Sequence, residues 1–96
     1  MNLYKVSQST NRNYDTFDSM VVVAESAEEA RDIDPERSWY WKDEGDSRLY
    51  IDWDEVKDRA YTAWCTSSKD VKVVYLGEAD ERFKKTAIII ASFNAG

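Results

Sequence analysis

The sequence predicts an α+β fold: a single-layer antiparallel sheet of about four strands, with one or two short helices packed on one face. Four segments are rich in β-branched and aromatic residues, and polar, turn-forming residues separate them. A helix start signal at Ser26 lies between the second and third of these segments. The 96 residues are enough for one modest hydrophobic core, so residues 1–96 are expected to form a single domain.

The first two predicted strands lie near the N-terminus. Residues 3–7 alternate apolar and polar side chains, as a half-buried strand does. Residues 8–13 are polar and turn-forming, so they are expected to form a loop. Residues 19–24 include three consecutive valines, which indicate a second, buried strand.

A short helix is predicted directly after the second strand. Ser26 is a favourable N-cap, and Glu29 stands three residues later, where a capping box places its acid. An apolar face with a spacing of three residues ends at Ile33. The residue before Pro35 resists the α conformation, so the helix is expected to stop there.

The middle of the chain, residues 36–65, permits two interpretations. Residues 39–41 and 49–53 could pair as a hairpin across a charged loop. Alternatively, Asp52 caps a helix with Glu55 at the capping-box position. Both interpretations hold together if a strand ends near residue 51 and a helix follows it.

The C-terminal third predicts two more strands. Residues 71–76 form the third strand, ended by Gly77, and residues 78–85 are expected to contain a short helical turn. Residues 86–93 carry no charge and three consecutive isoleucines, which predicts a central strand covered on both faces. The nine residues 77–85 are too few for a parallel crossover, so residues 71–76 and 86–93 are expected to be antiparallel neighbours. Residues 19–24 are a further expected neighbour of residues 86–93.

The net charge of −6 is unevenly distributed along the chain. Residues 25–58 carry thirteen acidic and five basic side chains, a local charge of −8. Such a surface repels phosphates and anionic headgroups, so we expect no direct nucleic-acid partner and no membrane partner. It attracts a protein with a basic surface.

The residue types exclude several kinds of chemistry. The chain has no histidine, so neither a Cys-His nor a Ser-His-Asp nucleophile can form. A lone Cys65 cannot make a zinc site, and the EF-hand spacing is absent. We therefore expect no enzyme activity, no catalytic residue, no cofactor and no metal site. Cys65 is expected to be a small buried hydrophobe in a reducing, cytoplasmic compartment.

An acidic and aromatic stretch, residues 39–64, is the main candidate site. Its aromatic residues could fill the core while its acids form a solvated face. Alternatively, its Trp and Tyr residues anchor a protein partner and its acids steer a basic surface toward them. Its carboxylates could also take the place of phosphates in a nucleic-acid channel. The predicted partner-binding residues are Trp39, Trp41, Asp43, Glu44, Asp46, Asp52, Trp53, Asp54, Glu55 and Asp58.

The N-terminal loop is an alternative site. Arg12 could meet an anion and Tyr14 could stack on a ring, with Asp15 beside them, which would suit a nucleotide-like ligand. The same residues also suit an ordinary strand connection with an Asx turn. Exposed tryptophans could equally mark a homodimer face.

Segments at both ends of the chain carry a resemblance to known proteins. They are residues 3–8, 14–19, 22–26 with 28–31, 73–79 and 91–96. In these segments the chain resembles small, mostly uncharacterised accessory proteins encoded by bacteriophages. The resemblance implies a stoichiometric inhibitor of host machinery in the host cytoplasm, anti-CRISPR-like or directed at another defence system. It transfers no catalytic residue, and a structural phage accessory role is also compatible with it.

Overall fold

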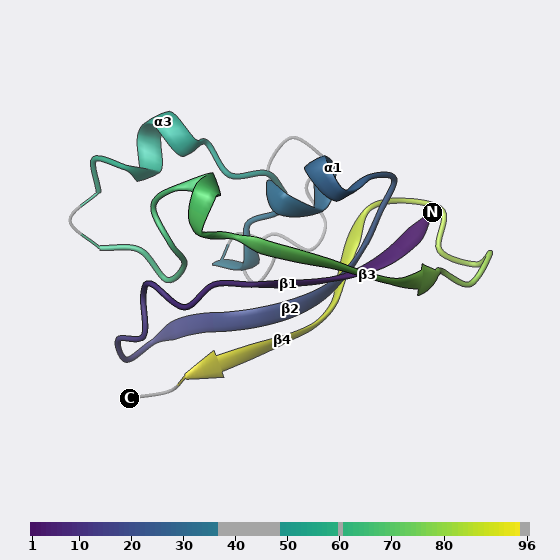
Figure 1. Ribbon diagram of the computed structural model, residues 1–96, viewed down its shortest axis with the longest axis horizontal. Helices are drawn as coiled ribbons and strands as arrows, with labels where there is room; N and C mark the ends of the chain where they lie inside the picture. The colour runs from purple at the N-terminus through teal and green to yellow at the C-terminus, as the bar shows by residue number, and fades with distance from the viewer. Residues whose placement is uncertain (37–48, 60, 95–96) are drawn as a thin grey trace.

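The computed structural model of the chain describes residues 1–36, 49–59 and 61–94 (Figure 1). Four strands form one antiparallel sheet in the order β3-β1-β2-β4, and the helices lie to one side of it. The predicted α+β class is confirmed. The elements are β1 (Asn2–Ser7), β2 (Thr16–Ala24), α1 (Ala27–Arg31), α3 (Trp53–Val56), the 3-10 helix η2 (Ser68–Asp70), β3 (Lys72–Glu78) and β4 (Ala87–Asn94).

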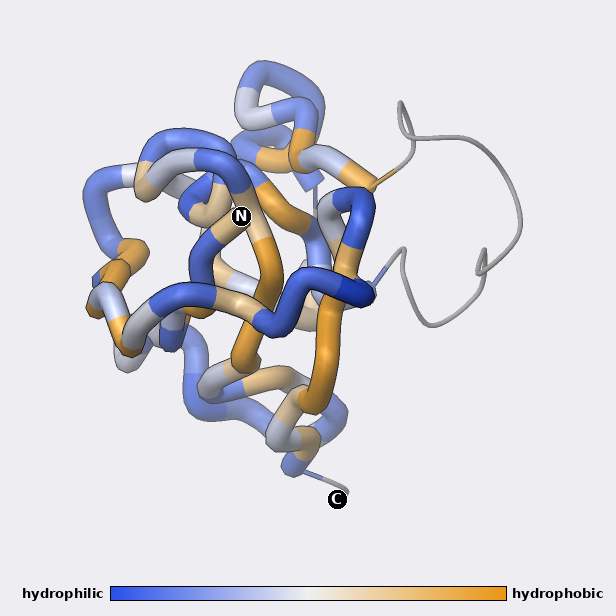
Figure 2. Tube along the Cα trace, turned by 90° about the vertical axis from the view of Figure 1, so that its right-hand side faces the viewer, coloured by the Kyte–Doolittle hydropathy of each residue, from blue (hydrophilic) through white to orange (hydrophobic). Residues whose placement is uncertain are grey.

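The β1–β2 hairpin is the centre of the sheet. Tyr4 lies opposite Val22, and Val6 lies opposite Met20, and all four side chains are buried on the helix side. The alternation of side chains along a strand puts Lys5 on the other face, where it is exposed. Hydrophobic residues accordingly follow the strands, while hydrophilic residues gather in the connections (Figure 2).

The core lies between this face of the sheet and the segments that cover it. Ala30 from α1, Ile33, and the run from Ala63 to Cys65 pack against the strand residues. Trp64 is 2% exposed and is the largest fully buried side chain among the described residues. None of the helices in the described part of the chain is long and apolar enough to cross a membrane.

The prediction that residues 86–93 form the central strand is wrong. β4 is an outer strand, and Ile89 and Ile90 are 44% and 65% exposed. Its partner is β2, so the expected contact with residues 19–24 is confirmed, whereas the expected pairing with residues 71–76 is wrong. The absence of charge in a strand signals apolar side chains, but it does not determine how many strands flank it.

The connection between β3 and β4 explains the outer position of both strands. The two strands are antiparallel, as predicted, but β1 and β2 lie between them. Three interstrand spacings amount to about 14 Å, and eight residues can extend over about 26 Å. The short connection therefore reaches across the end of the sheet. It contains a turn in which the Phe83 N–H donates to the Asp80 carbonyl oxygen (3.0 Å), rather than the predicted helical turn.

Gly77 does not end β3 as predicted, because the strand continues to Glu78. The register of the β1–β3 pair shifts between Leu3 and Tyr4, where β3 holds an extra residue. Gly77 has a φ of 148°, a conformation that residues with a Cβ rarely adopt. The glycine therefore serves a β-bulge inside the strand.

The predicted cap of α1 is confirmed. The Glu29 N–H donates to Ser26 Oγ at 3.1 Å. The Glu29 carboxylate accepts a hydrogen bond from the Thr86 hydroxyl, which ties α1 to the start of β4. The helix ends at Arg31, so Ile33 is not on its apolar face as predicted; it forms a β-bridge with Tyr50 instead.

Where the structure describes the middle of the chain, it agrees with the second interpretation, in which Asp52 caps a helix. Asp52 caps α3, as predicted. Residues 49–51 run antiparallel to residues 32–34, with the Ile51 N–H donating to the Asp32 carbonyl oxygen at 2.6 Å. The hairpin partner predicted at residues 39–41 lies outside the described residues.

Candidate protein-binding surface

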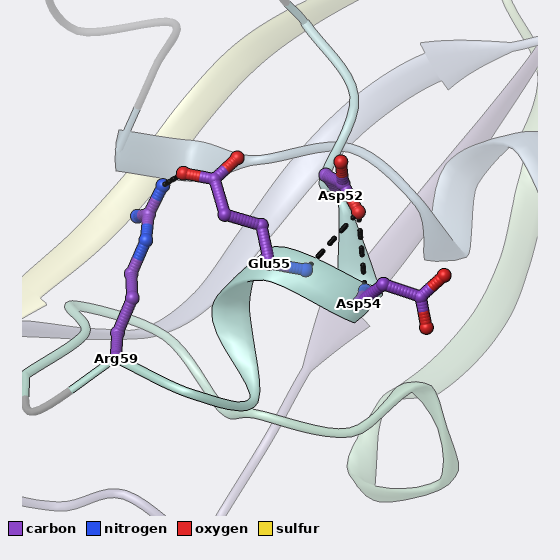
Figure 3. Close-up of polar contacts among 4 residues, drawn as sticks. All are labelled: Asp52, Asp54, Glu55 and Arg59. Atoms are coloured by element: carbon purple, nitrogen blue, oxygen red, sulfur yellow. Dashed lines mark hydrogen bonds and ion pairs between the residues drawn. The ribbon is translucent and has the colours of Figure 1, made fainter.

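The start of α3 is organised by Asp52. Its Oδ1 accepts hydrogen bonds from the backbone N–H groups of Asp54 (3.1 Å) and Glu55 (3.2 Å), as Figure 3 shows. Two N–H groups that a helix start leaves unpaired are thereby satisfied. A helix of four residues has little intrinsic stability, so we expect this cap to stabilise it.

Trp53 fixes α3 to the rest of the molecule. Its ring packs against the core, and its indole Nε1 donates to Asp32 Oδ1 at 2.9 Å. Asp32 is the C-cap of α1, so the contact joins the two helices. The structure therefore uses this predicted partner-binding tryptophan as an internal anchor of the site.

Three carboxylates project from α3 and the residues that follow it. The Asp54 side chain is 98% exposed and the Glu55 side chain 54%, and Asp58 is also exposed. Glu55 Oε1 lies 2.7 Å from Arg59 Nη2, whereas Asp54 is 3.8 Å from Lys57 Nζ. Exposed pairs of this kind contribute little to stability.

Acidic side chains from two parts of the chain act on Arg59. The pKa of Arg59 is raised, first by its hydrogen bond to Glu55, while partial burial acts in the opposite direction. The nearby charges of Glu36 and Asp34 raise it further. Asp34 and Glu36, which follow α1, therefore act on the same side chain as Glu55 of α3.

We name the four residues Asp52, Asp54, Glu55 and Asp58 the acidic ledge. The structure brings these four predicted partner-binding residues together on one short helix and its flanks. Trp53 lies beneath them. The other five predicted residues, Trp39, Trp41, Asp43, Glu44 and Asp46, lie outside the described residues.

The loop between β1 and β2 is held by two amide side chains. Gln8 Nε2 donates to the carbonyl oxygens of Asn11 and Phe17, both at 2.8 Å. Asn11 Nδ2 donates to the carbonyl oxygens of Thr62 (2.8 Å) and Trp64 (2.7 Å). The loop thus clamps the segment that carries the buried tryptophan.

Sequence reasoning placed both amides in a loop but did not predict the hydrogen bonds that they make. Side chains alternate between the two faces of a strand, so Gln8 is expected on the same buried face as Tyr4 and Val6. This alternation could have predicted that Gln8 is buried. The partners of Asn11 are more than fifty positions away, and no local pattern reveals them.

Arg12, Tyr14 and Asp15, the predicted ligand-binding residues, are exposed in this loop, and Tyr14 is 76% exposed. Asp15 has a φ of 61°, a conformation that Asp tolerates better than most residues. The Tyr61 hydroxyl donates to the Asp15 carbonyl oxygen at 2.7 Å. Desolvation raises the pKa of Tyr61, and the charge of Asp15 adds to the effect.

Cys65 is buried, as predicted, with 1% of its surface exposed. Desolvation raises the pKa of its thiol to about 11, so the reactive thiolate is suppressed at neutral pH. Among the residues described, no group of three or more His, Cys, Asp or Glu side chains is arranged to hold a metal ion.

Comparison of the chain with protein-family models, with curated proteins and with solved structures returns no match.

Proposed function

We propose that this chain is a non-enzymatic phage accessory protein that binds a basic surface of a host protein through the acidic ledge and inhibits that protein. The observation that carries the proposal is that Asp54 and Glu55 are exposed on a helix, and Asp58 just after it, and that this helix is held by the Asp52 cap and by the Trp53–Asp32 hydrogen bond. Charges held in place before binding lose less conformational freedom on association. They also accelerate encounter with a surface of opposite charge.

The resemblance to phage accessory proteins supports the cellular setting of this proposal. It suggests a host protein in the cytoplasm, belonging to a defence system or handling nucleic acid, and an anti-CRISPR-like effect. A nucleic-acid-handling protein offers the required basic surface, because it binds phosphates with Lys and Arg. Carboxylates of the acidic ledge would then compete with phosphates for the same basic residues.

Charge reversal on the acidic ledge tests the proposal. The double variant Asp54→Lys/Asp58→Lys changes two exposed residues and leaves the cap and the Trp53 contact unchanged. The matched control, Glu78→Lys/Glu81→Lys, reverses two exposed acids at the far end of β3. The three tagged proteins are expressed in host cells, and the captured proteins are identified by mass spectrometry and compared at increasing salt.

We expect a protein captured by the wild type and the control but lost with the ledge variant. With that protein purified, we expect the ledge variant to bind roughly tenfold to a hundredfold more weakly, because two opposing charges replace two attractive ones. Wild-type protein should also displace nucleic acid from the partner. Equal capture by all three proteins, or a partner whose activity and nucleic-acid binding do not change, would contradict the proposal.

The N-terminal loop offers a second function, binding of a nucleotide-like ligand. The observation in its favour is the exposed Tyr14 ring in a loop that also carries exposed Arg12. Titration of wild type and Arg12→Ala with a panel of nucleotides, followed by intrinsic fluorescence, tests this function. A saturable response that Arg12→Ala abolishes would support it, and a flat response across the panel would exclude it.

A further inference from the structure

Arg59 makes a close ionic contact with the acidic ledge. The chain keeps turning after α3 ends, because the Arg59 N–H donates to the Val56 carbonyl oxygen at 3.2 Å. This turn keeps Arg59 on the same side as Glu55, four positions earlier, where such residues can pair. The Arg59 guanidinium donates to the Glu55 carboxylate at 2.7 Å (Figure 3). One carboxylate of the ledge therefore already binds a guanidinium from its own chain.

Further negative charge reaches Arg59 from the residues that follow α1. The Trp53 indole bonds the Asp32 carboxylate, which joins the start of α3 to the end of α1. Asp34 and Glu36 come shortly after Asp32 in the chain. The pKa of Arg59 is raised first by its hydrogen bond to the ledge and further by the charges of Asp34 and Glu36. The guanidinium thus occupies a position where the protein stabilises a positive charge.

A neighbouring lysine makes a looser contact with the ledge. Lys57 Nζ is 3.8 Å from Asp54 Oδ1, and the Lys57 side chain is 60% exposed, whereas the Arg59 side chain is 31% exposed. Solvent and salt screen an exposed pair more than a partly covered one. Arg59 therefore neutralises the charge of the ledge more effectively than Lys57 does.

We propose that the Arg59–Glu55 pair is an autoinhibitory contact, which an arginine side chain of the partner displaces when it binds the acidic ledge. The proposal rests on the proposed function, since it concerns the regulation of that same surface. An arginine of the partner can donate to the Glu55 carboxylate as Arg59 does, because the two guanidinium groups are chemically identical. The exchange conserves the hydrogen bond, so its cost is small.

Arg59 should oppose binding in two ways. A basic partner must first separate Arg59 from Glu55, and the displaced guanidinium then repels the incoming positive charges. Removing Arg59 should therefore strengthen binding. The opposite role makes the opposite prediction: if Arg59 held Glu55 in the geometry that the partner needs, removing Arg59 would weaken binding.

A fluorescently labelled hexa-arginine peptide serves as the probe for this contact. Its binding to the full chain is followed by fluorescence anisotropy at low and at physiological salt, with wild type and Arg59→Gln. The matched control is Lys84→Gln, which removes the same charge from an exposed residue. Lys84 belongs to the connection between β3 and β4, which lies at the opposite end of the molecule from α3 (Figure 1). Circular dichroism establishes that the variants are folded.

We expect Arg59→Gln to bind the peptide about fivefold more tightly than the wild type at low salt, and Lys84→Gln to stay within about twofold of it. The gain should shrink as the salt concentration rises, because the effect is electrostatic. The conservative variant Arg59→Lys keeps the charge and should bind like the wild type. An equal gain in Arg59→Gln and Lys84→Gln, or weaker binding by Arg59→Gln, would overturn the autoinhibitory contact.

The charge-reversed ledge, Asp54→Lys/Asp58→Lys, separates this inference from the proposed function. Peptide binding by the wild type that the charge reversal abolishes, without a gain in Arg59→Gln, would leave the ledge as the binding surface and reject only the role of Arg59. If neither the wild type nor Arg59→Gln binds the peptide, or if the charge reversal has no effect, the ledge itself is rejected as the binding surface, and the autoinhibitory contact with it.

Discussion

The adjacent residues Trp64 and Cys65 are both buried, but burial affects their polar atoms in different ways. The buried thiol of Cys65 remains protonated, because burial raises the free energy of its anion. The indole Nε1 of Trp64 cannot change its protonation, and it has no hydrogen-bond acceptor among the described residues. Each side chain therefore has its own measurable effect on stability.

The Cys65 thiol should make stability depend on alkaline pH. Its pKa is raised in the folded state, from about 9 to about 11, so the unfolded chain loses this proton first as the pH rises. The stabilisation is complete below pH 9 and is lost between about pH 9 and pH 11. Its size is on the order of 2 kcal/mol. Chemical unfolding at several pH values, compared between wild type and Cys65→Ala, measures this difference.

Other groups that titrate at alkaline pH, such as lysines and tyrosines, are common to both proteins and cancel in the comparison. Parallel curves for the two proteins from pH 8 to pH 11 would show that the thiol is not responsible. Slow reaction of native Cys65 with a thiol reagent at neutral pH provides an independent check.

Trp64→Phe should be less destabilising than Trp53→Phe, although Trp64 is the more deeply buried residue. At Trp64 the smaller ring leaves a cavity costing about 1 kcal/mol, but it also removes an unpaired N–H that costs about 1–3 kcal/mol. At Trp53 the change breaks the bond to Asp32 and should cost about 2 kcal/mol. Urea unfolding of both variants measures the order, and the reverse order would indicate that the Trp64 N–H is satisfied in solution.

At the scale of elements, both short helices depend on caps and contacts more than on helix propensity. α1 has five residues and α3 has four, well below the length at which an isolated helix is stable. Ser26 and Asp52 each accept a hydrogen bond from a backbone N–H in the first turn. Removing a cap should therefore loosen the whole element.

Asp52→Ala should lower the free energy of unfolding by about 1 kcal/mol, because it leaves two N–H groups of α3 without their acceptor. Asp54→Ala is the matched control, since it removes one neighbouring acid and should change stability by less than about 0.5 kcal/mol. Urea unfolding measures both values. If α3 displays the charges that bind the partner, both variants should weaken that binding, but only Asp52→Ala should also lower stability. Equal stability of the two variants would mean that the cap is not needed.

The caps could be predicted from sequence because each one involves residues only two or three positions apart. The extents of the four strands were also predictable within a few residues from hydrophobic patterning. Sheet order was not, because the outer position of residues 86–93 depends on the crossing connection between β3 and β4. At the acidic ledge, the exposure of the carboxylates could be predicted, whereas the inward role of Trp53 depends on Asp32, twenty-one positions away.

At the scale of the whole molecule, the sheet order sets where stability is concentrated. β1 and β2 have a strand on each side, and Val6 and Val22 are fully buried between the sheet and its covering segments. β3 and β4 each have one strand neighbour among the described residues. Segments with fewer neighbours open with a lower free energy than the core.

The rate of backbone hydrogen exchange should therefore differ between the central and the outer strands of the sheet. We expect the slowest exchange in β1 and β2 and faster exchange in β3 and β4, because each outer strand has one strand neighbour among the described residues. Hydrogen exchange followed by mass spectrometry of peptides from each strand measures this order. Equal protection of all four strands, or slower exchange in an outer strand than in β1 and β2, would contradict it.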